Sequence, residues 1–101
     1  MKLNVNNSPL LKRISMAIAE HEGPGCTLHV SVSGEPVWEK SSNGEEVYVR
    51  WLCWSIENGD SELVPPQFEV VSPEITLECL KYDLPHVFSE VSVVVDNDIE
   101  V

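Results

Sequence analysis

The pattern of apolar and polar positions predicts one helix near the start of the chain. Its apolar residues recur at the spacing of a single helix face: Leu10, Leu11, Ile14, Ala17 and Ile18. Ser8 is a favoured N-cap residue, Pro9 suits the first helical position, and the Gly-Pro-Gly run at 23–25 should end the helix. Lys12 and Arg13 fall between the apolar positions and should face water.

From residue 26 the period changes from helical to strand-like. Residues 26–33 alternate apolar and polar side chains, which is typical of a strand with one buried face. Asn43 and Gly44 tolerate positive φ and predict a hairpin turn at 41–44. Further strands are expected at 37–39, 45–56, 68–71 and 91–95.

Two proline-containing segments are expected to interrupt the regular structure, at Pro65-Pro66 and at Leu84-Pro85. Between them, Ser72-Pro73 resembles a helix start and predicts a second short helix near 73–82. The same stretch also alternates apolar residues with period two, so a strand remains the alternative there.

These elements predict a single α+β domain covering residues 1–101, with two layers. The N-terminal helix should pack on an antiparallel sheet of four to five strands. A chain of this size buries about 65% of its surface on folding, enough for one hydrophobic core without metal or disulfide crosslinks.

The charge of the chain is strongly negative and unevenly distributed. It has 17 acidic and 6 basic side chains and a net charge of −11. Residues 34–101 carry −12 of this, against +1 for residues 1–33. This balance argues against direct nucleic-acid binding, and no run of apolar residues is long enough to span a membrane. The polar start of the chain lacks a signal-peptide core, so a cytoplasmic location is expected.

Candidate chemistry is sparse. His21, Cys26 and His29 are close in sequence, but Cys26 and His29 should point to opposite faces of one strand, which disfavours a metal site. We therefore expect no metal, no cofactor and no enzymatic activity. The alternative is a small-ligand or enzymatic domain with a Cys/His pocket formed by Trp38, Trp51, Cys53 and His86.

The strand at 45–56 has two largely apolar faces. Its even-numbered face carries Tyr48, Arg50 and Trp54, and these residue types dominate interface hot spots. If the helix covers the odd-numbered face, the even-numbered face is free to bind a partner. If the helix covers the even-numbered face instead, these side chains are structural.

Charge and aromatic residues together suggest a protein that binds and inhibits a basic protein partner. Acidic residues would speed the encounter and Tyr48, Arg50 and Trp54 would slow dissociation. The acidic residues expected to contribute flank the turns and should form one compact patch around the apolar anchors: Glu45, Glu46, Glu57, Asp60 and Glu62. Bacterial immunity proteins that neutralise nuclease toxins share this size and composition. A phage-encoded DNA mimic and a structural homodimer are the alternatives.

Overall fold

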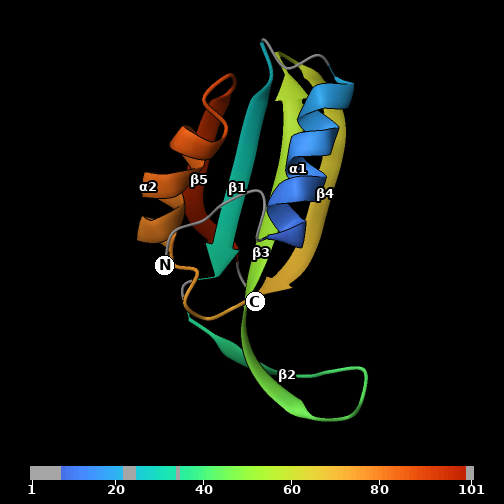
Figure 1. Ribbon diagram of the computed structural model, residues 1–101, viewed down its shortest axis with the longest axis vertical. Coiled ribbons are helices and arrows are strands. Elements are labelled where there is room, and N and C mark those ends of the chain that lie inside the picture. The colour runs from blue at the N-terminus through green and yellow to red at the C-terminus, as the bar shows by residue number, and fades with distance from the viewer. Residues whose placement is uncertain (1–7, 22–24, 34, 100–101) are drawn as a thin grey trace.

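The computed structural model describes residues 8–21, 25–33 and 35–99 of the chain. The elements follow in the order α1 (Pro9–Glu20), β1 (Thr27–Ser33), β2 (Val37–Lys40), β3 (Glu46–Asn58), β4 (Ser61–Val71), α2 (Leu77–Val87) and β5 (Ser92–Ile99). Both helices lie on one face of a five-stranded sheet (Figure 1). The predicted two-layer α+β fold is confirmed.

Strand β3 organises the sheet. It pairs antiparallel with β1, β2 and β4. Strand β5 pairs with β1 in parallel, so the sheet is mixed rather than purely antiparallel. The parallel pair is possible because α2 carries the chain back across the sheet before β5 begins.

The hydrophobic core lies between the helices and the even-numbered face of β1 and β3. In β1 the even positions from Leu28 to Val32 are buried, and in β3 Leu52, Trp54 and Ile56 are buried. The helices contribute the facing side chains: Leu11, Ile14 and Ile18 from α1, and Leu80 and Leu84 from α2. The helices therefore cover the even-numbered face of β3, which was the alternative left open by the sequence.

The two helices begin at side-chain caps, as their sequences dictate. The Ser8 Oγ accepts a hydrogen bond from the Leu11 backbone N–H at 3.3 Å, as predicted for α1. Helix α2 begins later than predicted, because Thr76 is its cap and accepts from the Cys79 N–H at 3.2 Å. It also continues through Pro85, which falls in the last turn and removes one backbone donor there.

Strand β4 is longer than predicted and includes the two prolines that were expected to interrupt it. Pro65 and Pro66 lie where the register with β3 shifts, between the Trp54↔Gln67 and Ile56↔Val64 pairs. Proline is tolerated at such a bulge on an edge strand, because no ladder hydrogen bond is required there. In the described part of the chain, neither helix is long enough to cross a membrane.

Candidate partner-binding site

A two-stranded arm projects from the body of the domain. We define the arm as residues 37–49, which comprise β2, the turn after it and the first part of β3. Its strands pair from Val37↔Val49 to Lys40↔Glu46, whereas β4 pairs with β3 only from Arg50 onward. Figure 1 shows the arm extending beyond both helices, which gives the molecule its longest dimension of 41 Å.

The tip of the arm is an ordered turn. The Ser41 N–H donates to the Glu45 carbonyl at 2.8 Å, and the Gly44 N–H donates to the Ser41 carbonyl at 3.0 Å. Gly44 has φ 86°, a conformation that side chains with a Cβ rarely adopt. The Asn43 side-chain oxygen accepts from the Glu45 N–H, so the backbone and a side chain both fix the turn that was predicted here.

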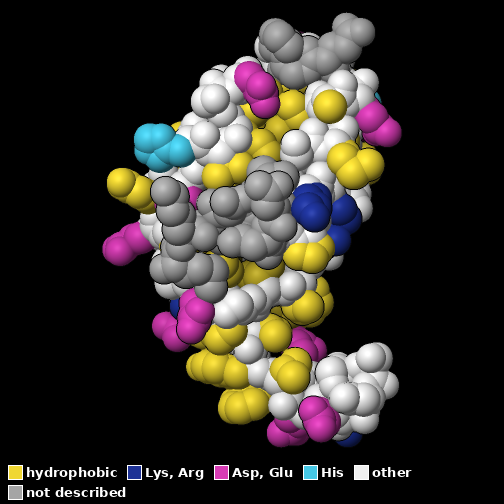
Figure 2. All heavy atoms as spheres, in the orientation of Figure 1, with side chains coloured by type: hydrophobic (Ala, Val, Ile, Leu, Met, Phe, Trp, Pro, Cys, Tyr) yellow, Lys and Arg dark blue, Asp and Glu magenta, His cyan; other side chains and the backbone are white. Residues whose placement is uncertain are grey.

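An aromatic pair occupies one face of the arm. Trp38 and Tyr48 are cross-strand partners with ring centroids 4.9 Å apart. Their side chains remain 64% and 45% exposed, because the arm extends past the helices that cover the same face of the sheet in the body. Figure 2 shows hydrophobic side chains gathered over this part of the molecule. Exposed aromatic residues grouped in this way are typical of an interaction surface.

The base of the arm is fixed by Arg50. Its Nε donates to the Pro73 carbonyl at 2.9 Å and its Nη1 donates to the Ser33 carbonyl at 3.1 Å. Ser33 is buried, and its Oγ accepts from the Trp51 backbone N–H at 3.1 Å. Arg50 was expected to be a partner-binding anchor. The structure places its guanidinium against the body, where it holds the arm in position.

Trp54, the third expected anchor, lies in the core. Its indole is 5% exposed and its Nε1–H donates to Glu69 Oε2 at 2.8 Å. The other oxygen of Glu69 forms an ion pair with Arg13 of α1. Trp54 thus joins the sheet to the helix and is not available to a partner, whereas Tyr48, on the same face of the same strand, is exposed.

A second apolar surface lies on the face of the sheet that the helices leave uncovered. It follows the odd-numbered positions of β3 and their neighbours on β4, where Phe68 pairs with Cys53 and Val70 with Trp51. Phe68 and Val70 are 63% and 52% exposed. The sequence predicted a strand at 68–71 but not its pairing with β3, so it did not indicate that Phe68 and Val70 belong to an exposed apolar surface.

This surface continues onto the arm. Trp51 donates from its indole Nε1 to Glu39 Oε1 of β2 at 3.1 Å, which ties the odd-numbered face of the arm to the body. Val47 is 36% exposed on the same face of β3. The arm therefore presents apolar groups on both faces, with its aromatic pair on one and aliphatic residues on the other.

The expected acidic residues do not form one patch. Glu45 and Glu46 lie at the tip of the arm, whereas Glu57, Asp60 and Glu62 lie around the β3–β4 turn at the opposite end of β3. Glu57 lies eleven positions beyond Glu46 along the strand, or about 36 Å at the rise of a β-strand. Figure 2 shows acidic side chains at both ends of the molecule. Only the first pair lies beside the aromatic residues.

The residues of the expected Cys/His pocket do not meet. Trp51 and Cys53 lie on the uncovered face of the sheet, Trp38 lies on the other face of the arm, and His86 is exposed on α2. Burial raises the pKa of the Cys53 thiol above its usual value, which keeps the sulfur protonated and poorly nucleophilic.

The pKa of the Cys79 thiol is also raised, first by burial and then by the charge of Asp83, to which its Sγ donates at 3.6 Å. His29 pairs with Glu57 across β1 and β3. Within the described residues, no three His, Cys, Asp or Glu side chains gather closely enough to hold a metal ion.

Comparisons of the chain with protein-family models, with curated proteins and with solved structures found no match. The arm, its aromatic pair and the acidic tip are therefore the features from which a function is inferred.

Proposed function

We propose that this chain is a non-enzymatic protein-binding domain that docks its arm on a basic protein partner. The observation that carries the proposal is the exposed Trp38–Tyr48 pair. The pair lies beyond the end of the hydrophobic core. The hydrogen bonds of Arg50 at the base of the arm and of the turn at its tip fix its position. Two aromatic residues arranged in this way lose little conformational freedom on binding, which favours affinity.

The charge of the chain supports a basic partner over a second copy. Glu45 and Glu46 are exposed at the tip, and the whole chain carries a net charge of −11. Two such chains repel each other at moderate ionic strength, whereas a cationic surface is attracted and oriented. Steering from the tip and anchoring by the aromatic pair would act on the same contact.

Inhibition of the partner is the activity expected from an acidic tip beside an exposed aromatic pair. An acidic domain seated on a basic functional surface excludes that surface from its own ligand, as an immunity protein does with a nuclease toxin. Glu57, Asp60 and Glu62 lie at the far end of the sheet from the arm. They would therefore contribute to the long-range electrostatic attraction of the partner and would not contact it directly.

The test is affinity capture from the native host, followed by kinetics with the purified partner. Trp38→Ala should weaken binding about 30-fold or more, the effect of removing a hot-spot residue. Tyr82→Ala is the matched control, because Tyr82 is an exposed aromatic residue on α2, away from the arm. The association rate should fall steeply with added salt, while the dissociation rate should change little.

Three outcomes would contradict the proposal. The captured partner could be acidic, it could bind Trp38→Ala as well as the parent chain, or the chain could self-associate with increasing concentration. The last outcome would support the structural homodimer. Binding that DNA displaces and that does not depend on the arm would support the DNA mimic.

A further inference from the structure

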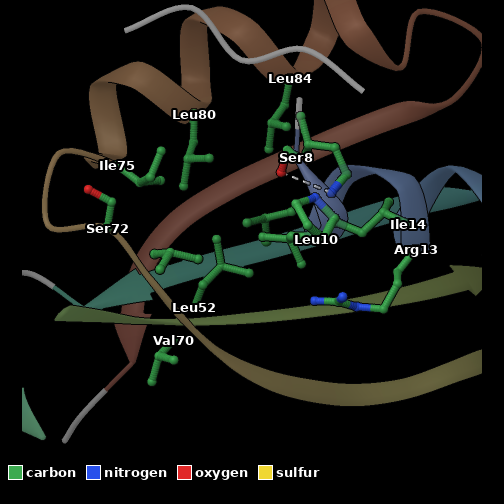
Figure 3. A pocket seen from close by; sticks show the side chains of 14 residues that line it. Ser8, Leu10, Arg13, Ile14, Leu52, Val70, Ser72, Ile75, Leu80 and Leu84 are labelled. Carbon is green, nitrogen blue, oxygen red and sulfur yellow. Dashed lines mark hydrogen bonds between the residues drawn. The ribbon is translucent and has the colours of Figure 1, made fainter. Parts of the chain in front are cut away.

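A cavity of about 470 Å³ lies between the two helices and the helix-covered face of the sheet. Its walls are aliphatic: Figure 3 shows Leu80 and Leu84 pointing into it from α2, Leu10 and Ile14 from α1, and Leu52 from β3. An apolar cavity of ~150 Å³ is large enough to take up benzene and stays free of water. This cavity is about three times larger, so it has room for an aliphatic chain of more than six carbons.

The polar groups of the cavity are few and lie at its edge. They are Ser8 at the start of α1, Ser72 after β4, and Arg13. Among the described residues that line the cavity, Arg13 is the one cation. Figure 3 shows its side chain along the edge, beyond the aliphatic groups.

Arg13 retains the capacity to bind an anion. A guanidinium carries five N–H donors, and the ion pair with Glu69 engages its Nη2. The side chain of Arg13 is 53% exposed, so a ligand that enters from solvent can reach it. Glu69 is itself held by the Trp54 indole, which keeps the Arg13 side chain oriented. Aliphatic walls with one cation at the edge match an aliphatic chain with an anionic end.

We infer that the cavity binds a medium-chain carboxylate, with the chain among the leucines and the carboxylate on Arg13. This site lies on the helix-covered side of the sheet, opposite to Phe68 and away from the arm, and Val70 of β4 is part of its rim. It is therefore independent of the proposed protein-binding function.

The experiment titrates the full chain with decanoate and with decanol, using isothermal calorimetry and methyl NMR spectra. Decanoate should bind and shift the methyl resonances of Ile14, Leu80 and Leu84. Decanol should bind about tenfold more weakly, because it lacks the charge that Arg13 recognises. Arg13→Gln should reduce decanoate affinity to that of decanol and leave decanol binding unchanged.

Lys12→Gln is the matched control, because it removes the same charge from the neighbouring exposed position, which does not line the cavity. It should leave both affinities unchanged. Leu80→Phe should narrow the cavity and weaken both ligands, and a thermal melt would show that this variant folds.

Two results would overturn the inference. One is equal binding of decanoate and decanol, or equal losses in Arg13→Gln and Lys12→Gln, which would remove Arg13 as the carboxylate site. The other is that decanoate does not shift the methyl resonances of the cavity. Nuclear Overhauser contacts from these methyls to Leu3 or Val5 in the free protein would then identify the chain's own first residues as the occupant.

Discussion

The body and the arm share a strand but differ in what covers it. Strand β3 has 13 residues and extends about 40 Å, whereas α1 has 12 residues and extends only about 18 Å, because a helix rises less per residue. The helix covers Leu52, Trp54 and Ile56 and leaves Tyr48 beyond its end. Stability should therefore reside in the body, and the exposed aromatic pair of the arm is free to serve binding.

The largest expected difference between the body and the arm is in the free energy of unfolding, and it is tested by shortening one aliphatic side chain of β3 in each region. Ile56 is fully buried in the body, and Ile56→Ala should lower the free energy of unfolding by about 2–5 kcal/mol. Val47 is 36% exposed in the arm, and Val47→Ala should change it by no more than about 0.5 kcal/mol. Urea denaturation followed by circular dichroism measures both. Equal losses would mean that the arm belongs to the same cooperative core.

The next largest effect is expected where the two regions join. Arg50→Gln removes the donors that serve the Ser33 and Pro73 carbonyls, and should lower the free energy of unfolding by about 1–3 kcal/mol. Amide exchange should rise across β2 more than across β1, because the base of the arm is released while the core is retained.

Arg50→Lys is the control for this joint. It keeps the positive charge but cannot donate to both carbonyls in a fixed geometry, so its effect should fall between those of the parent and Arg50→Gln. If Arg50→Gln changes partner affinity but neither stability nor exchange, Arg50 is the direct anchor that the sequence predicted.

The sequence predicted the parts of this fold that depend on local chemistry. Ser8 caps α1 as expected, because a hydroxyl followed by proline at the first helical position satisfies the helix start by itself. Gly44 forms the expected turn for a similarly local reason. Period-two patterns also gave the correct division of β1 and β3 into two faces.

What the sequence could not predict depends on partners distant along the chain. Tyr48 and Trp54 both lie on the even-numbered face of β3. Whether each side chain is buried depends on where α1 lies along β3 and on how far α1 extends. Pro65 and Pro66 looked like breakers because their tolerance depends on β4 being an edge strand with a bulge. The separation of the acidic residues, by contrast, follows from the predicted strand at 45–56, which already puts about 36 Å between Glu46 and Glu57.

The smallest expected effect sharpens the comparison on the uncovered face of the body, where Cys53 lies opposite Phe68. Burial raises the pKa of the Cys53 thiol above its ordinary value of 9.0, so the folded chain favours the protonated sulfur. Reaction with a disulfide reagent at pH 8 should be slower than in the unfolded chain, and Cys53→Ser assigns the signal against Cys26 and Cys79. The protonated form stabilises the fold fully below the unfolded pKa, and this contribution is lost as pH rises through the higher folded pKa. If Cys53 instead reacts faster when folded, the uncovered face of β3 activates this thiol, and a chemical role for that face would have to replace a purely apolar one.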